Sequence, residues 1–267
     1  MASISSNQAD VTTLTKHTPL KFVQFNSSIH PSFWSELENK KLNSWRLSTE
    51  PRVIYGSYEP ASLKDLPPTL YVSSGSFVKP ENVKKKHIAA QGILYLVNTL
   101  DEFKQLDKKT ILKEASEKIL SSCEDTNTTP MYTFVLLVHA DVKKHKYIYW
   151  FGFPAWVSTS KATTTTMVEK SRKLTKSEKE VIIKLIENGK NNAALSPMYI
   201  LHKDEILSIQ TDDAKIKKMT SKTSWEALHT KLIFLDPSSS EKNPGWPLRV
   251  FLRIPNQRYN LQIQKMD

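Results

Sequence analysis

The feature that most constrains this chain is a pair of long apolar runs separated by a short basic segment. The runs are YTFVLLVHA (132–140) and KYIYWFGFP (146–154). Runs so continuously apolar are too hydrophobic for strands with one face in water, so we expect two strands that helices cover on both faces. The segment between them is too long for a two-residue hairpin and predicts a short helical turn beginning near Asp141.

A helix is expected near the N-terminal end of the chain, after a β-prone segment at 20–28. Pro31 suits the first turn of this helix, and Pro51 ends the pattern. Apolar side chains recur on one helical face, and they are Phe33, Trp34, Leu37, Leu42 and Trp45. Residues 52–88 alternate short β-prone pieces with proline and glycine, which predicts an antiparallel meander.

A capping box marks the next helix. Thr99 and Glu102 have the spacing of this motif, and they follow a buried strand at 92–100. The helix after them carries an apolar stripe, which consists of Ile111, Leu112, Ala115, Ile119 and Leu120. We expect the stripe to lie in the core.

A second capping box, Thr175 with Glu178, begins the clearest helix of the chain, and Gly189 suits the position after its end. A polar segment of low complexity precedes this helix. The elements expected after it are strands at 198–202, 205–210 and 231–237 and a helix at 224–230.

Together these elements predict an α+β fold with mixed sheets and packed helices, divided into two lobes. The expected organisation is a disordered tail at 1–18, a first α/β lobe at 19–155, a polar linker at 156–173, a second α/β lobe at 174–254 and a tail at 255–267.

The chain has 267 residues and a formal net charge of +11, which favours polyanionic partners such as nucleic acid, anionic lipid or an acidic polypeptide. Its cations occur singly and in short runs, without a long basic arm. No apolar stretch reaches the roughly 18 residues that span a bilayer, and the opening residues lack a signal-peptide pattern. A single cysteine, Cys123, fits a reducing compartment. We therefore expect a cytoplasmic protein without a membrane span.

Standard catalytic signatures are missing from the sequence. The glycines, at 56, 75, 92, 152, 189 and 245, are too far apart for a dinucleotide-binding or phosphate-binding loop. The histidines lack metal-ligand spacing, so we expect no metal and no cofactor, and we interpret His139 as a hydrogen-bonded core residue. Cys123 follows a predicted helix C-terminus and is interpreted as a bystander thiol. A binding module is favoured over a catalyst, and an unrecognised hydrolase or transferase stays open.

The basic turn and its aromatic neighbours allow three interpretations: a nucleic-acid grip, a core hairpin with a solvated turn, or a docking site for an acidic protein. An exposed aromatic sheet can bind RNA, but YIYWFGF (147–153) lacks the glycine-aromatic pattern of an RNA-recognition motif. We expect most of the rings to be core and the turn to be functional. A second basic run, KKKH (84–87), is interpreted as a solvated surface segment.

Four segments of the sequence belong together when taken in chain order: FWSELENKKLNSWRL (33–47), GILYLVNTLDEFKQLDKK (92–109), ADVKKHKYIYWFGFPA (140–155) and DPSSSEKNPGWPLRVFL (236–252). With them, residues from about 20 to 252 resemble the N-terminal domain of the autophagy ubiquitin-like-modifier-activating enzyme. Within the last segment, we interpret Trp246 to Arg249 as a structural lock between the two lobes.

The resemblance implies a noncatalytic α/β domain that recruits autophagy conjugating enzymes. In that family a following domain of the same polypeptide adenylates the modifier, carries the catalytic cysteine and dimerises, and this sequence shows none of that domain. The resemblance therefore implies a monomeric fragment with no catalysis of its own, whose partners are the conjugating enzymes and the catalytic domain rather than nucleic acid. A basic nucleic-acid-binding domain is the alternative.

The resemblance also implies how the partner docks. The conjugating enzyme would supply a flexible, acid-rich insertion that binds partly as a helix in a groove. In such a complex apolar anchors give affinity, and cations around them speed the encounter. The partner-binding residues expected here are Lys143, Lys144, Lys146, Tyr147 and Tyr149.

Overall fold

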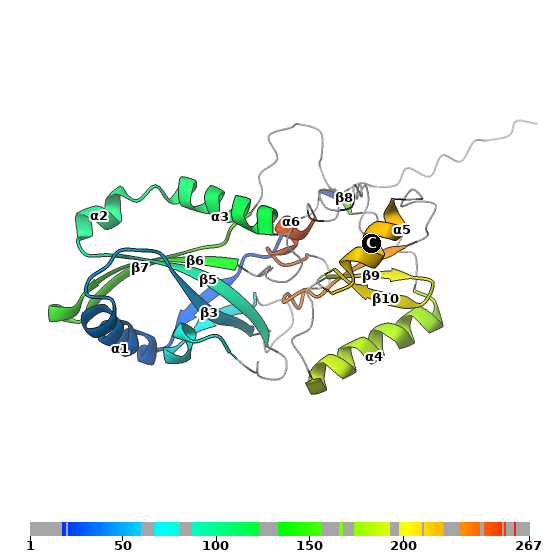
Figure 1. The fold of residues 1–267 in the computed structure, drawn as a ribbon, viewed down its shortest axis with the longest axis horizontal. Helices are drawn as coiled ribbons and strands as arrows, with labels where there is room; N and C mark the ends of the chain where they lie inside the picture. Colours follow the sequence, from blue (N-terminus) through cyan, green and yellow to red (C-terminus); the bar gives the residue numbers. More distant parts are fainter. Residues whose placement is uncertain are drawn as a thin grey trace, which may run out of the picture.

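The computed structural model describes residues 18–19, 21–59, 67–80, 87–122, 133–155, 166–167, 174–192, 198–209, 211–221, 230–240, 243–252, 254 and 259. Across these ranges the chain forms a six-stranded sheet, a three-stranded sheet and a two-stranded pair, with helices packed on the sheets (Figure 1). The predicted α+β class with mixed sheets is confirmed. The division into two lobes stays a prediction.

The six-stranded sheet mixes parallel and antiparallel neighbours. Its strands, in spatial order, are β2 (Asn26–Ile29), β4 (Thr69–Val72), β3 (Arg52–Glu59), β5 (Ile88–Val97), β6 (Thr133–Asp141) and β7 (Lys146–Gly152). The pairs β2/β4 and β5/β6 are parallel, and the other neighbours are antiparallel. The β-prone segment at 20–28 overlaps β2 only at its end; Val23 forms an isolated bridge with Gly245.

The antiparallel pairing predicted within residues 52–88 is confirmed, because β3 and β4 pair antiparallel. The following strand, β5, does not continue beside β4 but lies on the other side of β3. The register of β5 with β3 runs from Arg52 to Tyr58, and that of β4 with β3 covers only Ser57 to Glu59. The longer strand therefore occupies the centre of the sheet, and the short β4 lies nearer its edge.

Strands β6 and β7 differ in burial although both are apolar in sequence. The side chains of β6 from Phe134 to Val138 have no solvent exposure, which confirms a strand covered on both faces. Strand β7 is an edge strand, and Tyr149 on it is 50% exposed. The expectation that both faces of β7 are covered is therefore wrong, because a terminal strand of the sheet extends beyond the helices packed on it.

The N-terminal helix changes its winding after nine residues. Helix α1 (Pro31–Asn39) begins with proline, as predicted, and continues as a π-helix, η1 (Lys40–Ser44). In η1 the Trp45 N–H donates to the Lys40 carbonyl at 2.7 Å. The predicted apolar face holds for Phe33 and Leu37 and fails at Leu42, which is 53% exposed while Lys41 is only 3% exposed.

The helix also ends before Pro51, the residue predicted to stop it. Its last residue is Ser44, and Arg46 and Leu47 take left-handed conformations with φ of 49° and 65°. Left-handed backbone cannot continue a right-handed helix. The chain therefore turns toward β3 several residues before the proline.

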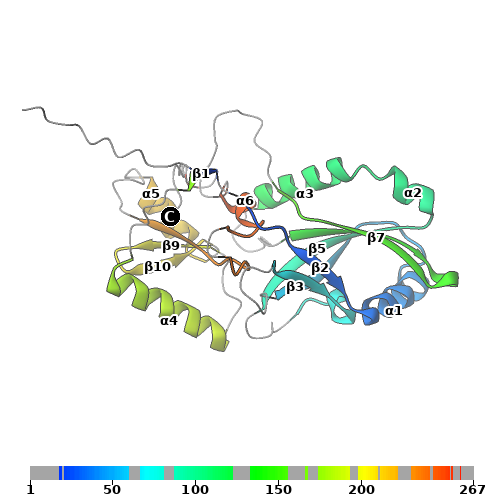
Figure 2. The same ribbon diagram turned by 180° about the vertical axis from the view of Figure 1, so that it is seen from behind.

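Helices α2 (Leu100–Gln105) and α3 (Lys108–Ser122) lie on the opposite face of the large sheet from α1, as both views show (Figures 1 and 2). The predicted capping box is present, with Oγ1 of Thr99 accepting from the Glu102 N–H at 3.1 Å. The sequence predicted a single helix here. The structure has two, and the second begins after Asp107, whose Oδ1 accepts a hydrogen bond from the Lys109 N–H at 3.0 Å.

The predicted stripe on α3 is core where the structure describes it. The buried residues Ile111, Ala115 and Ile119 belong to this stripe, and Leu112 is partly buried. Ile111 and Ala115 form a cluster with Val135 and Leu137 of β6. Leu120 and Cys123 lie outside the residues whose side chains are described, as does the basic run at 84–86.

The three-stranded sheet has the order β10 (Glu205–Ser208), β9 (Met198–His202) and β11 (Lys231–Phe234), and all three strands were predicted. Helices α4 (Lys176–Asn192) and α5 (Asp213–Thr220) lie on opposite sides of this sheet (Figure 1). The predicted helix at 224–230 falls almost entirely outside the described residues. The two-residue strands β1 (Thr18–Pro19) and β8 (Thr166–Met167) pair with each other.

Two features of this region differ from the predictions. The capping box of α4 is confirmed, because Oγ1 of Thr175 accepts from the Glu178 N–H at 3.1 Å, but Gly189 lies inside the helix rather than after it. The run KIKK (215–218) belongs to α5, which was not predicted. Ile216 within it has no exposure, and Met219 of the same helix packs against the same hydrophobic cluster, so these two apolar side chains help to dock the helix.

The NPGWPLR segment (243–249) joins parts of the chain that are distant in sequence. The Trp246 N–H donates to the Val23 carbonyl at 3.1 Å, and Nε1 of Trp246 donates to the Phe153 carbonyl at 3.2 Å. The guanidinium of Arg249 lies 4.5 Å from the centre of the Trp246 ring, a cation–π distance. Helix α6 (Leu248–Phe251) follows, with Leu248 buried. These contacts support the structural interpretation of Trp246 to Arg249.

An aspartate completes this junction. Asp236 accepts a hydrogen bond from the Gly245 N–H at 2.7 Å and one from the Ser238 N–H at 2.9 Å. Burial raises the pKa of Asp236, although these two hydrogen bonds oppose the rise. Further on, Tyr259 lies in the predicted C-terminal tail, but its side chain is buried and its hydroxyl donates to Asp213 at 2.9 Å.

Candidate partner-binding surface

Two of the predicted lysines, Lys143 and Lys144, lie on a 3₁₀ turn, η3 (Val142–Lys144), that joins β6 to β7, and Lys146 is the first residue of β7. Oδ1 of Asp141 accepts from the Lys144 N–H at 3.3 Å, and the His145 N–H donates to the Val142 carbonyl at 3.4 Å. His145 is left-handed, with φ of 47°, which directs the chain into β7. The predicted short helical turn near Asp141 is confirmed.

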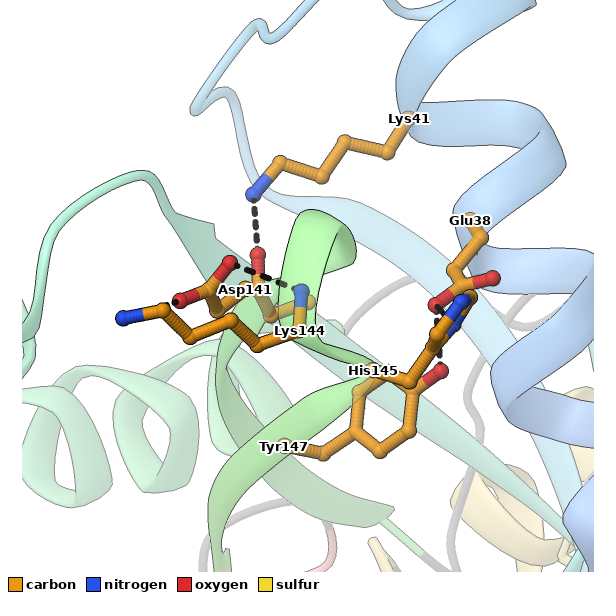
Figure 3. A network of polar contacts seen from close by, with 7 residues as sticks. Glu38, Lys41, Asp141, Lys144, His145 and Tyr147 are labelled. Atoms are coloured by element: carbon orange, nitrogen blue, oxygen red, sulfur yellow. Dashed lines mark hydrogen bonds and ion pairs between the residues drawn. The ribbon is translucent and has the colours of Figure 1, made fainter.

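Two side chains of the N-terminal helix hold this hairpin. Oε1 of Glu38 accepts a hydrogen bond from the Tyr147 hydroxyl and lies 3.1 Å from Nδ1 of His145. One turn further along, Nζ of Lys41 donates to the Ala140 carbonyl at 3.0 Å. Figure 3 shows both side chains extending from the helix toward the hairpin. The helix and the hairpin therefore form one structural unit, although Glu38 and Tyr147 are 109 positions apart.

An aromatic stack crosses the same contact. The Trp34 ring lies on the Tyr147 ring with a centroid distance of 4.4 Å and an angle of 12° between the planes. The Tyr149 ring lies 5.4 Å from the Trp34 ring, and Tyr149 remains half exposed. A half-exposed aromatic residue beside a fixed stack is a suitable apolar anchor for a partner protein.

The lysines of the turn and of the start of β7 have no strong ion-pair partner among the described residues. Lys143, Lys144 and Lys146 are all exposed. Lys144 lies 3.9 Å from Asp141, and an exposed pair at this distance contributes roughly 0 to 1 kcal/mol. Within the described part of the chain, no carboxylate lies within ion-pair distance of Lys143 or Lys146. These charges are available to an acidic partner.

The other face of β7 is structural. Ile148 and Trp150 pack against the cluster formed by α3 and β6, and Nζ of Lys108 lies 5.6 Å from the Trp150 ring. Most of the aromatic rings of this strand were predicted to lie in the core. The rings at 147, 150, 151 and 153 do pack against the hydrophobic clusters, but these four and the ring at 149 all keep some exposure to solvent. The prediction is therefore confirmed for packing and wrong for complete burial. Tyr147 and Tyr149 face α1, whereas Lys146 shares the strand parity of Ile148 and Trp150 and so faces the other side. We call the following residues of the hairpin and of the adjacent helix the hairpin surface: Trp34, Lys143, Lys144, Lys146, Tyr147 and Tyr149.

Burial and charge shift two titrating groups beside this surface. Burial, helped by the hydrogen bond to Glu38 and by its charge, raises the pKa of Tyr147 to about 12. Burial lowers the pKa of Lys41, while the negative charges of Asp141 and Glu102 oppose that change. Tyr147 therefore stays a hydrogen-bond donor at neutral pH.

The structure brings together all five predicted residues and adds Trp34, Glu38 and Lys41, which sequence reasoning missed. Trp34 was expected in the core. Glu38 and Lys41 gave no local signal, since their partners lie on a hairpin about a hundred positions away. The spacing of three residues between Glu38 and Lys41 places them on one side of a helix, and it is the one feature of the sequence that suggests a shared contact.

Other predicted features can be checked where the chain is described. His139 was expected to be a hydrogen-bonded core residue, but its Nδ1 is buried without a hydrogen-bond partner, so the expectation fails at that nitrogen. The described residues contain no group of three histidine, cysteine, aspartate or glutamate side chains that could hold a metal ion. Nor does any described helix have the length and apolar character needed to cross a bilayer.

Comparison with known proteins identifies the family. Residues 20–267 match the family described as the N-terminus of the ubiquitin-like modifier-activating enzyme ATG7, so the match continues beyond Leu252, where the resemblance was expected to end. The human enzyme ATG7 is 28% identical over 255 residues, and the Dictyostelium discoideum enzyme is 30% identical over 264 residues. These alignments cover 93% and 90% of this chain but 36% of each relative.

Solved structures agree with this assignment. The crystal structure of Kluyveromyces marxianus Atg7NTD superposes with a TM-score of 0.68 at 22% identity and covers 90% of this chain and 81% of that one. The Kluyveromyces marxianus Atg7NTD–Atg10 complex gives the same TM-score at 21% identity, with 90% and 78% coverage. At these identities the structures show a shared fold. Taken with the match over residues 20–267, they show that the chain belongs to the family of ATG7 N-terminal regions.

Proposed function

We propose that this chain is a docking domain that recruits an autophagy conjugating enzyme and performs no chemistry itself. The observation that carries the proposal is the family match over residues 20–267, in a family with a relative crystallised in complex with Atg10. The chain spans 36% of the length of its human and Dictyostelium relatives, whose descriptions name a modifier-activating activity. That activity is proposed to belong to another part of such a polypeptide.

We place the docking contact on the hairpin surface. Tyr149 offers a half-exposed ring beside the Trp34–Tyr147 stack, which suits an apolar anchor. Lys143, Lys144 and Lys146 add exposed positive charge at the same end of the hairpin. An acidic insertion of the conjugating enzyme would meet both features, with apolar residues on the rings and carboxylates near the lysines.

The proposed contribution to modifier transfer is proximity. A docked conjugating enzyme is held near the donor, so that transfer becomes effectively intramolecular and gains from a raised local concentration. Because proximity needs only a stable contact, the domain requires neither a nucleophile nor a cofactor for this role.

The test is a calorimetric titration of the chain with the conjugating enzyme, with and without its acidic insertion. We expect binding to the intact enzyme and a loss of at least about tenfold in affinity without the insertion. Equal affinity for both forms would show that the insertion does not dock here.

A parallel titration with random duplex DNA covers the alternative of a nucleic-acid-binding domain. That alternative requires affinity that falls steeply as salt is raised, since counterions are released from the phosphates. Tight binding of the duplex, together with no binding of the conjugating enzyme, would replace the docking proposal.

A further inference from the structure

The Glu38 carboxylate occupies the meeting point of two donors from the hairpin. Its Oε1 accepts from the Tyr147 hydroxyl and lies 3.1 Å from Nδ1 of His145, where a proton on that nitrogen donates to the same oxygen. The side chain of Glu38 is 17% exposed and that of His145 is 75% exposed, so the position can be reached from solvent. Figure 3 shows the two donors converging on this one carboxylate.

Contacts that do not involve Glu38 hold the ring of one donor and the backbone of the other. The stack of Trp34 on Tyr147 fixes the phenol ring. The η3 turn, which Asp141 caps through the Lys144 N–H, fixes the backbone of His145, whose side chain is 75% exposed. If the Glu38 side chain moved away, the Tyr147 hydroxyl would stay in place and the His145 ring would remain within reach of the same position, so the site for a carboxylate is partly preorganised.

We propose that Glu38 is an internal occupant of a carboxylate-binding site formed by His145 and Tyr147, and that a glutamate or aspartate of a docking partner displaces it. The inference rests on the proposed function for the identity of the partner and names the chemistry that this part of the surface recognises. Glu38 is then an autoinhibitory residue, because every acidic ligand must first compete with it.

The charges around the site favour an incoming carboxylate. Lys143, Lys144 and Lys146 are exposed on the same turn and at the start of β7, and Asp141 lies 3.9 Å from Lys144. An acidic segment approaching these lysines would bring its carboxylates to the hairpin. Displacement exchanges the contacts of Glu38 with Tyr147 and His145 for equivalent contacts with the incoming carboxylate, while Glu38 gains water in place of its partly buried position.

The test uses Glu38→Gln, which keeps an oxygen that can accept from Tyr147 and removes the charge. The matched control is Glu36→Gln on the same helix, where the lost partner is Lys40 at 3.2 Å and not the hairpin. We expect Glu38→Gln to speed association with the conjugating enzyme by about two- to fivefold at low salt, and Glu36→Gln to change it less than about 1.5-fold. If Glu38 only held the fold together, its loss would weaken binding instead.

A second substitution separates the local site from general electrostatics. Adding Tyr147→Phe or His145→Ala to Glu38→Gln should abolish the gain, because each removes a donor that would receive the partner's carboxylate. Thermal unfolding is measured first, to show that each variant is folded. Because His145 is exposed, the variant with His145→Ala still provides the test if the one with Tyr147→Phe does not fold. A gain that survives both substitutions, or equal gains for Glu38→Gln and Glu36→Gln, would overturn the proposal.

A synthetic peptide of alternating glutamate and alanine serves as a second probe. If the chain ignores the conjugating enzyme but Glu38→Gln still binds this peptide better than the parent chain does, the carboxylate site stands and the docking function falls. If the conjugating enzyme binds and Glu38→Gln shows no gain with either probe, the docking function stands and the carboxylate site falls.

Discussion

The Trp34 ring lies 4.4 Å from the Tyr147 ring with an angle of only 12° between their planes, so a residue of the first helix is stacked on a residue of an edge strand. Replacing Trp34 with alanine removes this stack and its contact with Tyr149. We expect Trp34→Ala to lower the free energy of unfolding by about 2 to 3 kcal/mol, measured by chemical denaturation. Trp34→Phe keeps an aromatic surface and should lose less than half as much.

Tyr149 and Trp150 are adjacent on β7 but face opposite sides of the sheet. We expect Tyr149→Ala to weaken binding of the conjugating enzyme by more than about tenfold while stability falls by less than about 1 kcal/mol. Trp150→Ala should instead lower stability by about 2 to 4 kcal/mol, because its ring packs on α3. Calorimetric titration and denaturation on both variants check the separation, and a reversed pattern would contradict the assignment of the two faces.

Reversing the charges of Lys143 and Lys144 should act on the rate of association. With Lys143→Glu and Lys144→Glu together, we expect association with the conjugating enzyme to slow by about tenfold at low salt and the melting temperature to stay within about 2 °C. Stopped-flow mixing at low and high salt measures the rates. Lys215 and Lys218 on α5 offer a matched pair of lysines for the same reversal away from the hairpin. If the pair on α5 slows association as much, net charge and not position is responsible.

Lys41 makes stability depend on pH. Burial lowers its pKa in the folded state below the ordinary value, so between those two values the unfolded chain binds more protons than the folded chain. Stability contributed through Lys41 therefore rises as pH rises through this window. We expect the free energy of unfolding of the parent chain to increase relative to that of Lys41→Met as pH rises through the alkaline range toward the ordinary lysine pKa of 10.5. A constant difference across that range would show that Lys41 is fully charged in the fold.

Gly245 leaves no room for a side chain. A Cβ atom there would lie 2.5 Å from Oδ1 of Asp236 and 2.9 Å from the Phe25 ring. Gly245→Ala should lower stability by about 1 to 3 kcal/mol, measured by denaturation. Gly75→Ala is the control, because a Cβ atom at that glycine meets its nearest neighbour at 3.8 Å. Equal losses in the two variants would contradict a steric cause.

The features predicted correctly depend on short-range sequence. Both capping boxes, Thr99 with Glu102 and Thr175 with Glu178, formed as expected, because each hydrogen bond joins residues three positions apart. The turn after Asp141 is local in the same sense. Buried strands were recognisable for a related reason, since a run such as Phe134 to Val138 has no polar side chain to place in water.

The features that were missed depend on sheet order and on helix winding. The apolar character of β7 predicted burial on both faces, whereas its position at the edge leaves Tyr149 exposed. The π-helix at 40–44 shifts which side chain faces inward, so Lys41 is buried in place of Leu42. Neither outcome follows from periodicity, because the first depends on which strands pair and the second on the contact between Lys41 and Ala140.

The attachment of the first helix to the β6–β7 hairpin has a consequence for any shortened form of this chain. A chain that began after Trp45 would retain every lysine of the hairpin but would lack Trp34, Glu38 and Lys41. Its tyrosines would have no ring to stack on, and the Ala140 carbonyl would lose its donor. The positive charge of the turn comes from a few consecutive residues. The surface that presents this charge, however, needs both the N-terminal helix and the β6–β7 hairpin, which are far apart in the sequence.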